Sequence, residues 1–381
     1  MGLPAVIGSA GTVVLVLAAC GAIYACMATW AMRRFVRRPK RQPSRYPSIS
    51  ILKPLHGSEP ELHENLTSFC AQAYAGPVQI VFGAQDPDDP ALEVALRVKA
   101  DHPGRDIVVV SDATNHGANR KIGNLINMAA HADGEVIIIS DSDVRIPPDG
   151  LDHIVATLDE PGVGLIYCLY RGRRTMSGWS QLAAMDVNFR FAPSAVVGAA
   201  LGAPLCLGPT MALRADMLNS IGGLKLLANF LADDFELGRA VRAAGHRVAC
   251  PPMVIDHVFP ECSAREMLAH ELRWARTIRL VEPAGYIGSV VTHFVPLALI
   301  GAALTGFAGW SLALLGAVGA LRMAQAVIIS RLLAVDSSLL WLVPLRDLLS
   351  FGVFLTGLFG ERVEWRGRRL RVSSDGAIAT A

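Results

Sequence analysis

The protein has 381 residues, of which 52% are hydrophobic and only 18% are charged, so its composition excludes an ordinary soluble chain. Its formal charge of +2 gives no sign of the basic surface with which a protein neutralises a nucleic-acid backbone, and we expect no nucleic-acid partner. The seven cysteines are odd in number and form no CxxC pair, which argues against a zinc knuckle or a disulfide framework.

The N-terminal segment predicts a membrane anchor. Residues 5–30 exceed the ~20 apolar residues with which a helix crosses a bilayer, and they contain no charged side chain. A cleaved signal peptide does not fit, because the segment lacks a basic start and is longer than ~7–15 apolar residues. Residues 33–45 then carry seven Arg or Lys and no acidic residue. The positive-inside tendency places this cluster in the cytosol, although a solvated charge run is the alternative interpretation.

A second apolar region lies near the C-terminus. It carries no Asp, Glu, Lys or Arg from residue 283 until Arg322, and we expect two membrane spans, at 287–307 and 311–334. A third stretch, 339–360, is interrupted by a proline and two charged residues. We expect it to be interfacial or re-entrant, which would leave the basic tail in the cytosol. A full third span would put that tail outside.

Residues 46–282 alternate short strand-like runs with helical stretches. This alternation predicts a mostly parallel α/β sheet covered on both faces. The expected strands are 50–55, 78–84, 106–110 and 135–139, and the expected helices between them are 59–72, 91–100 and 119–132.

Polar side chains follow three of these strands at their carboxyl ends, where open α/β sheets bind ligands. Lys53 lies in the first strand end, Asp86 follows the second, and Asp141 and Asp143 follow the fourth. An Asp-x-Asp at the end of a buried strand can hold Mg²⁺ or Mn²⁺ against phosphate oxygens. The motif alone is common in acidic loops. The apolar run VIII before it and the second acidic loop favour a metal site.

Two later segments carry further candidates. Asp233 and Asp234 precede a helical pattern, and from the residues alone they fit acidic caps that interact with the helix dipole. Residues 263–280 predict a second helix, opened by a capping box. An arginine on its surface could bind a diphosphate, and a tryptophan could flank a sugar or acceptor, a core tryptophan being the alternative. Four residues share one face of this helix: His270, Arg273, Trp274 and Thr277.

The order of short motifs resembles a known enzyme family. Between residues 50 and 370 the chain contains LKPLHG, QDPDDPA, NRKIGNLIN, SDSDVR, GGL, ADDFELG, HELRW and VEWRGR. Their order is similar to that of glycosyltransferase family two folds. It is most similar to family twenty-one, the ceramide glucosyltransferases and the bacterial hopanoid-biosynthesis glycosyltransferases, of which the hopanoid branch resembles this chain more closely. The resemblance implies an α/β fold of GT-A type, a nucleotide-sugar-binding domain, with N-terminal and C-terminal transmembrane helices.

The resemblance also implies roles for individual residues. Asp234 matches the family's catalytic base, and Asp141 and Asp143 match its motif for Mg²⁺ or Mn²⁺. The family pattern is Gln or Arg, two residues, then Arg-Trp; a histidine stands first here, which leaves the role of His270 open. The residues expected in the nucleotide-sugar site are Lys53, Asp86, Lys121, Asn124, Asp141, His270, Arg273 and Trp274.

The implied activity is inverting transfer of glucose or N-acetylglucosamine from a UDP-sugar to a hydroxyl of a membrane lipid, a hopanoid polyol or a ceramide. A processive polysaccharide synthase and a catalytically silent nucleotide-sugar-binding scaffold are the alternatives. We expect a multi-pass protein of a bacterial inner membrane with a cytosolic catalytic domain. The expected organisation is a transmembrane anchor (1–32), a basic cytosolic linker (33–45), a GT-A catalytic domain (46–282), a C-terminal membrane region (283–360) and a basic cytosolic tail (361–381).

Overall fold

The structure is a computed structural model that describes residues 3–175, 177–365, 368–373 and 376–379. It divides into two compact units, each built from three separate stretches of chain. The segment expected to form the catalytic domain, 46–282, contributes to both units. We call them the helical unit (Met1–Arg37, Ser177–Leu201 and Glu261–Leu370) and the sheet unit (Arg38–Met176, Gly202–Pro260 and Arg371–Ala381).

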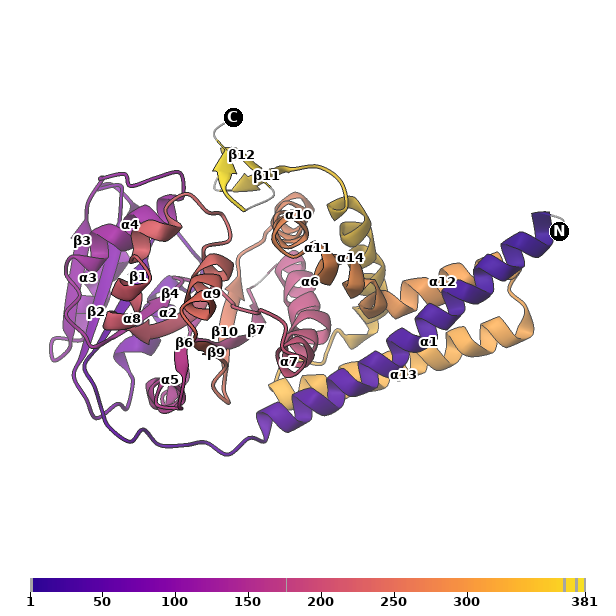
Figure 1. Cartoon of the computed structure of the whole chain (residues 1–381), viewed down its shortest axis with the longest axis horizontal. Coiled ribbons are helices and arrows are strands. Elements are labelled where there is room, and N and C mark those ends of the chain that lie inside the picture. The colour runs from indigo at the N-terminus through magenta and orange to yellow at the C-terminus, as the bar shows by residue number, and fades with distance from the viewer. Residues whose placement is uncertain (1–2, 176, 366–367, 374–375, 380–381) are drawn as a thin grey trace. The chain divides into compact units, whose positions relative to one another are not determined.

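The sheet unit is built on a seven-stranded sheet in the order β3-β2-β1-β4-β8-β6-β9 (Figure 1). The first four strands in this order are parallel, and β8 runs antiparallel to both of its neighbours, β4 and β6. The four strands expected from the sequence are confirmed to within one residue. The strands are β1 (Ile49–Pro54), β2 (Val78–Ala84), β3 (Asp106–Ser111), β4 (Val136–Ser140), β6 (Val163–Tyr167), β8 (Thr210–Arg214) and β9 (Arg247–Ala249).

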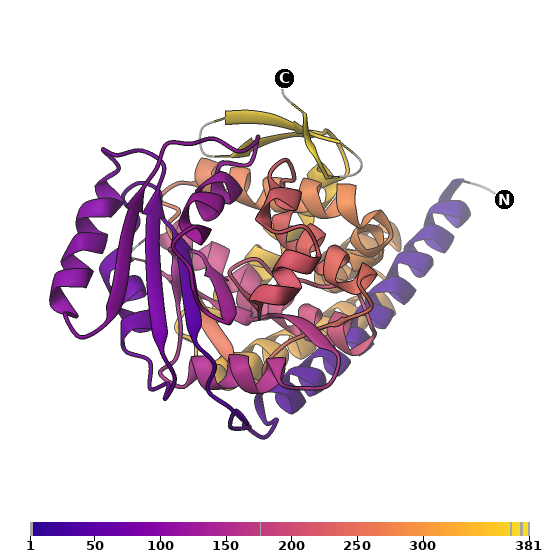
Figure 2. The same cartoon turned by 60° about the vertical axis from the view of Figure 1, so that its left-hand side comes forward.

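Helices lie on both sides of this sheet, as Figure 2 shows for the violet strands of its first half. The apolar run of β4 is buried at every position, as a strand between two helical layers requires. Local signals set the helix starts: the side chain of Asp89 caps α3 and that of Asn119 caps α4. The helices are α2 (Leu62–Cys70), α3 (Pro90–Asp101), α4 (Arg120–Ala129), α5 (Gly150–Leu158), α8 (Ala215–Ser220), η2 (Leu224–Leu227) and α9 (Asp233–Ala243).

Smaller strand pairings and ion pairs complete the sheet unit. In a three-stranded sheet, β10 (Val254–Phe259) is antiparallel to β5 (Val144–Arg145) and parallel to β7 (Leu169–Arg174). Near the C-terminus, β12 (Arg368–Val372) pairs antiparallel with β13 (Ile378–Ala379). Three basic linker residues pair with acids of the sheet unit: Lys40 with Asp149, Arg41 with Glu160 and Arg45 with Glu135.

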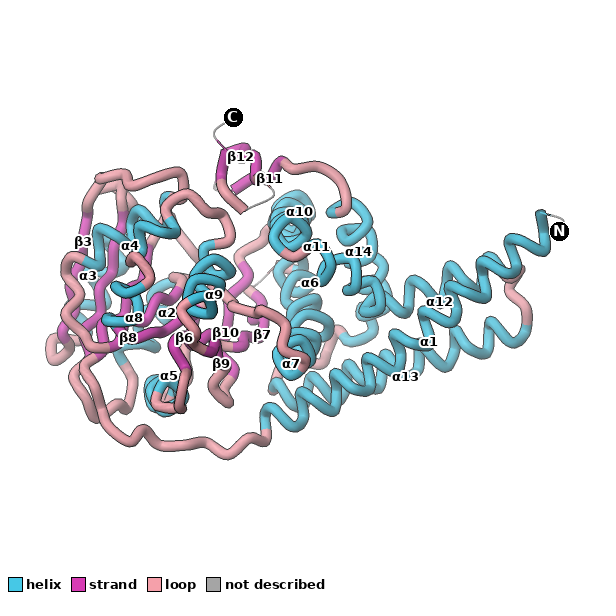
Figure 3. The backbone as a smooth tube through the Cα atoms, in the orientation of Figure 1, coloured by secondary structure: helices cyan, strands magenta, loops and turns pink. Residues whose placement is uncertain are grey.

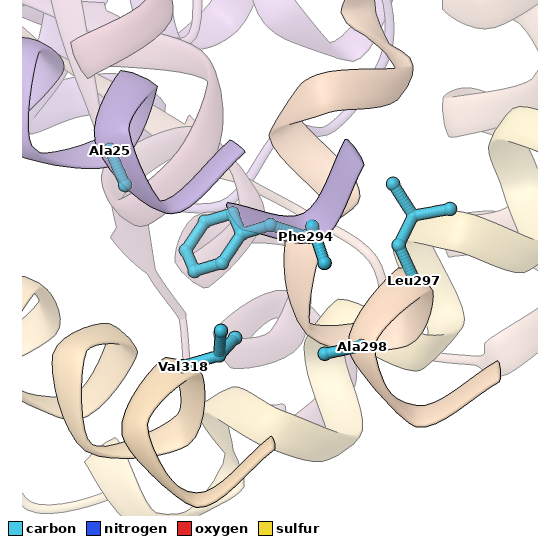
Figure 4. Packing of buried hydrophobic residues seen from close by; sticks show 6 residues of the cluster. Ala25, Phe294, Leu297, Ala298 and Val318 are labelled. Atoms are coloured by element: carbon cyan, nitrogen blue, oxygen red, sulfur yellow. The ribbon is translucent and has the colours of Figure 1, made fainter. Parts of the chain in front are cut away.

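In the helical unit, α1 (Leu3–Val36), α12 (Phe294–Leu304) and α13 (Gly309–Leu333) pack side by side (Figure 3). Their backbones approach closely: a Cβ atom added at Gly21 would lie 2.3 Å from the Val291 carbonyl oxygen, so a larger residue does not fit there. The three helices share a buried apolar cluster, part of which Figure 4 shows, and its members are Ala18, Ala25, Phe294, Leu297, Ala298 and Val318.

Shorter elements surround these helices. The α6 helix continues through a π-helical turn, η1, into α7, and Ser263 caps α10 by accepting a hydrogen bond from the Glu266 amide, as the capping box predicts. Two residues of the expected VEWRGR motif, Arg366 and Gly367, lie outside the described residues. The remaining elements are α6 (Gly178–Asp186), η1 (Val187–Phe191), α7 (Ala192–Ala200), α10 (Ala264–Val281), α11 (Pro283–Gly288), η3 (Ser289–His293), η4 (Leu340–Leu342), α14 (Val343–Gly357) and β11 (Arg362–Trp365).

Among the described residues, four helical stretches are long and apolar enough to cross a membrane. Ile7–Val36, Pro283–Leu304 and Gly309–Leu333 match the three spans expected from the sequence. The fourth, Leu340–Gly357, covers the stretch expected to be interfacial or re-entrant. Its α14 helix packs more extensively on α10 than on α12 or α13. Length and composition thus allow either arrangement, and the re-entrant placement stays a prediction.

Candidate active site

The residues of chemical interest in the sheet unit gather where β4 and β8 meet. Because β8 is antiparallel to β4, its amino end lies beside the carboxyl end of β4. The Asp141 amide donates to the Pro209 carbonyl at 3.0 Å, and the hydroxyls of Ser140 and Thr210 lie 2.9 Å apart. The loop after β4 and the loop before β8 therefore share one edge of the sheet.

Lys121, in the first turn of α4, lies among carboxylates. Its Nζ atom is 2.6 Å from Asp141 Oδ1 and 3.8 Å from Asp233 Oδ2. Burial alone would lower the pKa of Lys121, but these two carboxylates and Asp234 raise it above the ordinary value. Burial and, less strongly, Asp143 raise the pKa of Asp141, which Lys121 opposes. Lys121 is therefore a protonated cation held at the end of β4.

Asp143 is paired with a histidine that no sequence motif indicated. Burial raises the pKa of Asp143, but the imidazole of His257, 3.0 Å from Oδ2, together with the cations of Lys53 and Lys121, brings the pKa below the ordinary value. The other oxygen, Oδ1, is buried and has no hydrogen-bond partner in the described part of the chain. A buried carboxylate oxygen of this kind suits a metal ion or an ordered water.

The protein alone offers an incomplete metal site. Within the described ranges, no three His, Cys, Asp or Glu side chains are grouped so that they could hold an ion together. Mg²⁺ is usually bound by one or two carboxylates, with water and substrate phosphates filling its other positions. The loop of Asp141 and Asp143 fits such a partial ligand set, because it presents two carboxylates and one of them has an unpartnered buried oxygen.

Asp234 lies in the first turn of α9. Its Oδ1 accepts a hydrogen bond from the Phe235 amide at 2.8 Å, and the Gly208 amide also donates to the carboxylate. A Cβ atom at position 208 would lie 3.2 Å from Asp234 Oδ2, so glycine allows this close approach. Burial, followed by the neighbouring Asp233, raises the pKa of Asp234 to about 6. The N-cap position belongs to Ala232, and both aspartates lie where the helix dipole favours negative charge.

Two residues expected to contact the nucleotide are buried. Lys53 has no exposed surface: its ammonium donates to the Asp141 carbonyl at 2.7 Å and lies 3.8 Å from the centre of the Phe69 ring. Burial lowers the pKa of Lys53 to about 7. Asn124 is 4% exposed and donates to the Gly83 carbonyl at 2.7 Å. Both side chains hold the ends of strands, so a direct nucleotide contact would require them to move.

The loop after β2 contains one exposed and one buried acid. Asp86 is exposed, and its Oδ1 accepts a hydrogen bond from the Asp88 amide at 3.0 Å. Asp89 is buried, caps α3 and accepts a hydrogen bond from the Gly57 amide at 2.9 Å. Asp89 therefore joins the loops that follow β1 and β2. Its position directly before a proline at the start of a helix could have indicated the cap from the sequence.

The helical unit carries the remaining candidates on α10. His270, Arg273 and Trp274 lie on one face, as their spacing predicts. His270 Nδ1 is 2.5 Å from Oε1 of the buried Glu261, and its ring centre lies 4.3 Å from that of Trp274. The Thr277 hydroxyl donates a hydrogen bond to the backbone carbonyl of Arg273. His270 thus sits between Glu261 and Trp274.

The sheet unit therefore brings together five candidate residues that come from four different motifs of the sequence. Asp86 lies on the separate loop after β2, and three further candidates belong to α10 of the helical unit. Sequence reasoning missed His257, which lies 114 residues from Asp143 in the chain. The residues that gather around the end of β4 are Lys53, Lys121, Asp141, Asp143 and, through Gly208 and Pro209, Asp234.

The fold defines the class of protein. The mannosyltransferase PcManGT from Pyrobaculum calidifontis, solved in complex with GDP-Man and Mn2+, superposes with a TM-score of 0.54 at 19% sequence identity. The match covers 92% of this chain and 99% of that chain. A likeness at this identity shows the fold alone, and the fold is that of the GT-A glycosyltransferases.

The chain belongs to glycosyl transferase family 21, whose family model matches residues 13–378. Ceramide glucosyltransferase 1 of Caenorhabditis elegans is 24% identical over 208 residues, which are 53% of this chain and 44% of that protein. The ceramide glucosyltransferase of Candida albicans is 29% identical over 125 residues, 30% and 23% of the two chains. An N-acetylglucosaminyltransferase of Bradyrhizobium diazoefficiens is 24% identical over 244 residues, 61% and 49%. The chain spans about half the length of the first two curated relatives, 44% and 54%.

Proposed function

We propose that this protein is a membrane-bound inverting glycosyltransferase. It moves glucose or N-acetylglucosamine from a UDP-sugar to a hydroxyl of a membrane lipid, a hopanoid polyol or a ceramide. Membership of family 21 and the GT-A fold support transfer from a nucleotide-sugar donor. Four helices that are long and apolar enough to cross a membrane support an activity at the bilayer. Relatives named for ceramide glucosylation and for N-acetylglucosaminyl transfer support these sugars.

One observation carries the proposal: the loop before β8 joins the proposed base to the proposed metal loop. Gly208 donates to the Asp234 carboxylate, and the next residue, Pro209, accepts from the Asp141 amide. A carboxylate with a pKa of about 6 is ionised at pH 7, yet it is a stronger base than an ordinary aspartate. A nucleotide donor and an acceptor hydroxyl bound at this edge would therefore meet a suitable proton acceptor.

In the proposed reaction, the lipid hydroxyl attacks the anomeric carbon of the sugar. Asp234 takes the hydroxyl proton, and the bond between the anomeric carbon and the diphosphate oxygen breaks on the opposite face. A single displacement inverts the configuration and needs no covalent intermediate. The cation of Lys121 stabilises the charge that develops on the departing diphosphate, because fixed charges act strongly where water is excluded.

Asp141 and Asp143 are the proposed metal ligands. The unpartnered oxygen of Asp143 supports this assignment, as does the backbone of Asp141, which Lys53 and Pro209 hold in place. A bound Mg²⁺ or Mn²⁺ would supply positive charge that neutralises the diphosphate. For Lys53 we propose this supporting function in place of a direct nucleotide contact.

The other candidates receive proposed functions from their chemistry. Asp86 is exposed after β2 and is proposed to line the nucleotide pocket. The Arg273 guanidinium can bind a diphosphate through two hydrogen bonds, and Trp274 can provide a flat wall for the sugar or acceptor. His270 is proposed to orient Trp274, because its ring lies between that tryptophan and Glu261.

The proposed location is a bacterial inner membrane, with the catalytic residues in the cytosol. The basic cluster at 33–45 begins in the last turn of the first apolar helix and contains no acidic residue. UDP-sugars are made in the cytosol, so this orientation gives the proposed site access to its donor.

The test uses the full chain purified into lipid nanodiscs. Labelled UDP-glucose, UDP-N-acetylglucosamine or GDP-mannose is added with ceramide, a hopanoid polyol or no further lipid. We expect one labelled glycolipid bearing a single sugar, formed from a UDP-sugar only when a lipid acceptor is present. A labelled polymer would indicate a polysaccharide synthase, and binding without transfer would indicate a scaffold. Transfer from GDP-mannose alone would contradict the proposed donor.

A further inference from the structure

Helix α14 contacts three other helices of the helical unit through buried charged side chains. Arg322 of α13 donates to Asp347 through two hydrogen bonds, of 2.7 and 2.8 Å. Arg346, the preceding residue, donates from Nε to the Leu182 carbonyl of α6 at 2.8 Å and from Nη2 to Glu271 of α10 at 2.5 Å. The α14 helix is therefore a common support for α13, α6 and α10.

Glu271 is the carboxylate that contacts Arg346 most closely. The other nearby carboxylate, Asp186, lies 3.6 Å from Arg346 Nη2, and Arg190 and Ser350 already donate to it, each at 2.6 Å. The Arg346 side chain is 3% exposed and that of Glu271 is 12% exposed. A buried charge is costly without a partner, so the folded chain keeps these two side chains together.

A second set of contacts fixes α10 to the far end of α14. A Cβ atom at Gly357 would lie 2.9 Å from the Ala275 side chain, so the two helices touch closely there. Arg279 Nε donates to the Gly357 carbonyl at 3.0 Å. The residues Glu271 and Arg279 hold α10 at two points about 12 Å apart along its axis. Arg273 lies between these points.

The ion pair restricts geometry more than it adds stability. Replacing a buried ion pair with packed apolar residues is often neutral or stabilising, so stability alone does not account for it. A guanidinium–carboxylate contact is directional, whereas apolar contacts allow a helix to rotate or slide by small amounts. The contact between Glu271 and Arg346 therefore restricts how far α10 can rotate about its axis.

We propose that Glu271 is a positioning residue for the diphosphate-binding face of α10. Side chains two residues apart on a helix point about 200° apart, so Glu271 does not share a target with Arg273 and acts on it through the helix. By fixing the rotation of α10 against α14, Glu271 sets the direction of the Arg273 guanidinium. This inference rests on the proposed function, because Arg273 has a diphosphate to bind only if the protein uses a nucleotide-sugar.

The experiment is a double-mutant cycle on the full chain in nanodiscs, with kcat and donor KM measured for single-sugar transfer to lipid. The variants are Glu271→Gln, Arg273→Ala and the two combined. Glu266→Gln is the matched control, because it is the same substitution at an exposed position of the same helix and keeps a hydrogen-bond acceptor for the Cys262 amide. Thermal unfolding and size-exclusion chromatography verify that each variant is folded.

We expect Glu271→Gln to lower kcat about 10- to 100-fold with donor KM changed less than about threefold, because a displacement near 1 Å can cost about 100-fold in rate. The combined variant should be no more than about twofold slower than Arg273→Ala, since Glu271 acts through Arg273. Glu266→Gln should match the wild type.

The inference would be overturned if Glu271→Gln had the wild-type kcat. It would also be overturned if the kcat loss of the combined variant equalled the product of the losses in the two single variants. If Glu271→Gln does not fold, Arg346→Lys takes its place in the same cycle. Lysine keeps the positive charge but cannot contact the Leu182 carbonyl and Glu271 at the same time, as arginine does. The rate of the combined variant is again compared with that of Arg273→Ala, and losses that multiply would overturn the inference. A wild-type chain that transfers no sugar refutes the proposed function and this inference together. An active wild type with multiplying losses refutes the inference alone.

Discussion

Replacing Asp234 with asparagine should slow the protein and stabilise it at the same time. Burial and the neighbouring Asp233 raise the pKa of Asp234 to about 6, whereas the ordinary value is 3.8. At neutral pH the folded chain therefore holds a carboxylate in its charged form at a site that disfavours the charge. Asparagine has almost the same shape, carries no charge and can still accept the hydrogen bond from the Phe235 amide.

The pKa shift sets the size and the pH window of the effect. Each pKa unit corresponds to about 1.4 kcal/mol, so the charged form costs the folded state up to about 3 kcal/mol. This cost is absent below about pH 4, grows between about pH 4 and 6, where Asp234 is ionised in the unfolded chain but still mostly protonated in the folded one, and is complete above that range. Asparagine cannot accept from both Phe235 and Gly208, which offsets about 1 kcal/mol. We expect a net gain of about 2 kcal/mol at pH 7.5, or about 4–8 °C in Tm for a unit of this size.

The assay pairs thermal unfolding at pH 7.5 and 4.5 with initial rates of sugar transfer. The gain in Tm should shrink at the lower pH, and the rate at pH 7.5 should fall by roughly 10²–10⁴, the usual contribution of a positioned base. UDP-sugar affinity should stay near that of the wild type. Asp216→Asn in α8 is the matched control: Asp216 is exposed and likewise accepts from the next residue's amide, at 2.6 Å. The control variant should have the Tm and the transfer rate of the wild type.

Two results would refute the reasoning. A stabilised Asp234→Asn variant with an unchanged rate would mean that the carboxylate serves only the first turn of α9. A variant with a lower Tm at pH 7.5 would mean that the site favours the charged form, contrary to the raised pKa.

Three further predictions concern the metal, the pH profile and the topology. EDTA should abolish transfer, Mg²⁺ or Mn²⁺ should restore it, and Asp141→Ala should prevent the restoration; full turnover in EDTA would contradict a metal role. The wild-type rate should fall about tenfold per pH unit below pH 6, as Asp234 becomes protonated, and a flat profile down to pH 4.5 would exclude it as the base. A reporter fused after Arg371 should be active in the cytosol if 339–360 is re-entrant, and activity outside would require a full third span.

The sequence predicted local elements well because their signals are local. The four apolar residues VIII at 136–139 fit a buried strand, and β4 is buried throughout. Ser263 indicated the start of α10, and the structure has that cap. The assignment of α6 and α10 to the helical unit was not predictable in the same way, because it depends on contacts such as that between Glu271 and Arg346, which are 75 residues apart.

The candidate site was predictable as a set of residues but not as a set of contacts. The motifs indicated Asp141 and Lys121, and the structure pairs them directly. Lys53 was expected to face a ligand because it lies at the carboxyl end of the first strand. In the structure it is buried, and its partners are backbone and hydroxyl oxygens. The pairing of Asp143 with His257 joins residues far apart in the chain, and no local pattern encodes it.

The antiparallel ladder between β4 and β8 limits where the chain length can vary. Its register runs from Ser140 opposite Thr210 to Val136 opposite Arg214. Because side chains alternate along a strand, inserting one residue within β8 would turn its side chains to the other face of the sheet. The same insertion would displace Gly208 from Asp234. Residues 202–204 are exposed and lie outside the ladder, so changes in loop length are tolerated better there than between Gly208 and the end of β8.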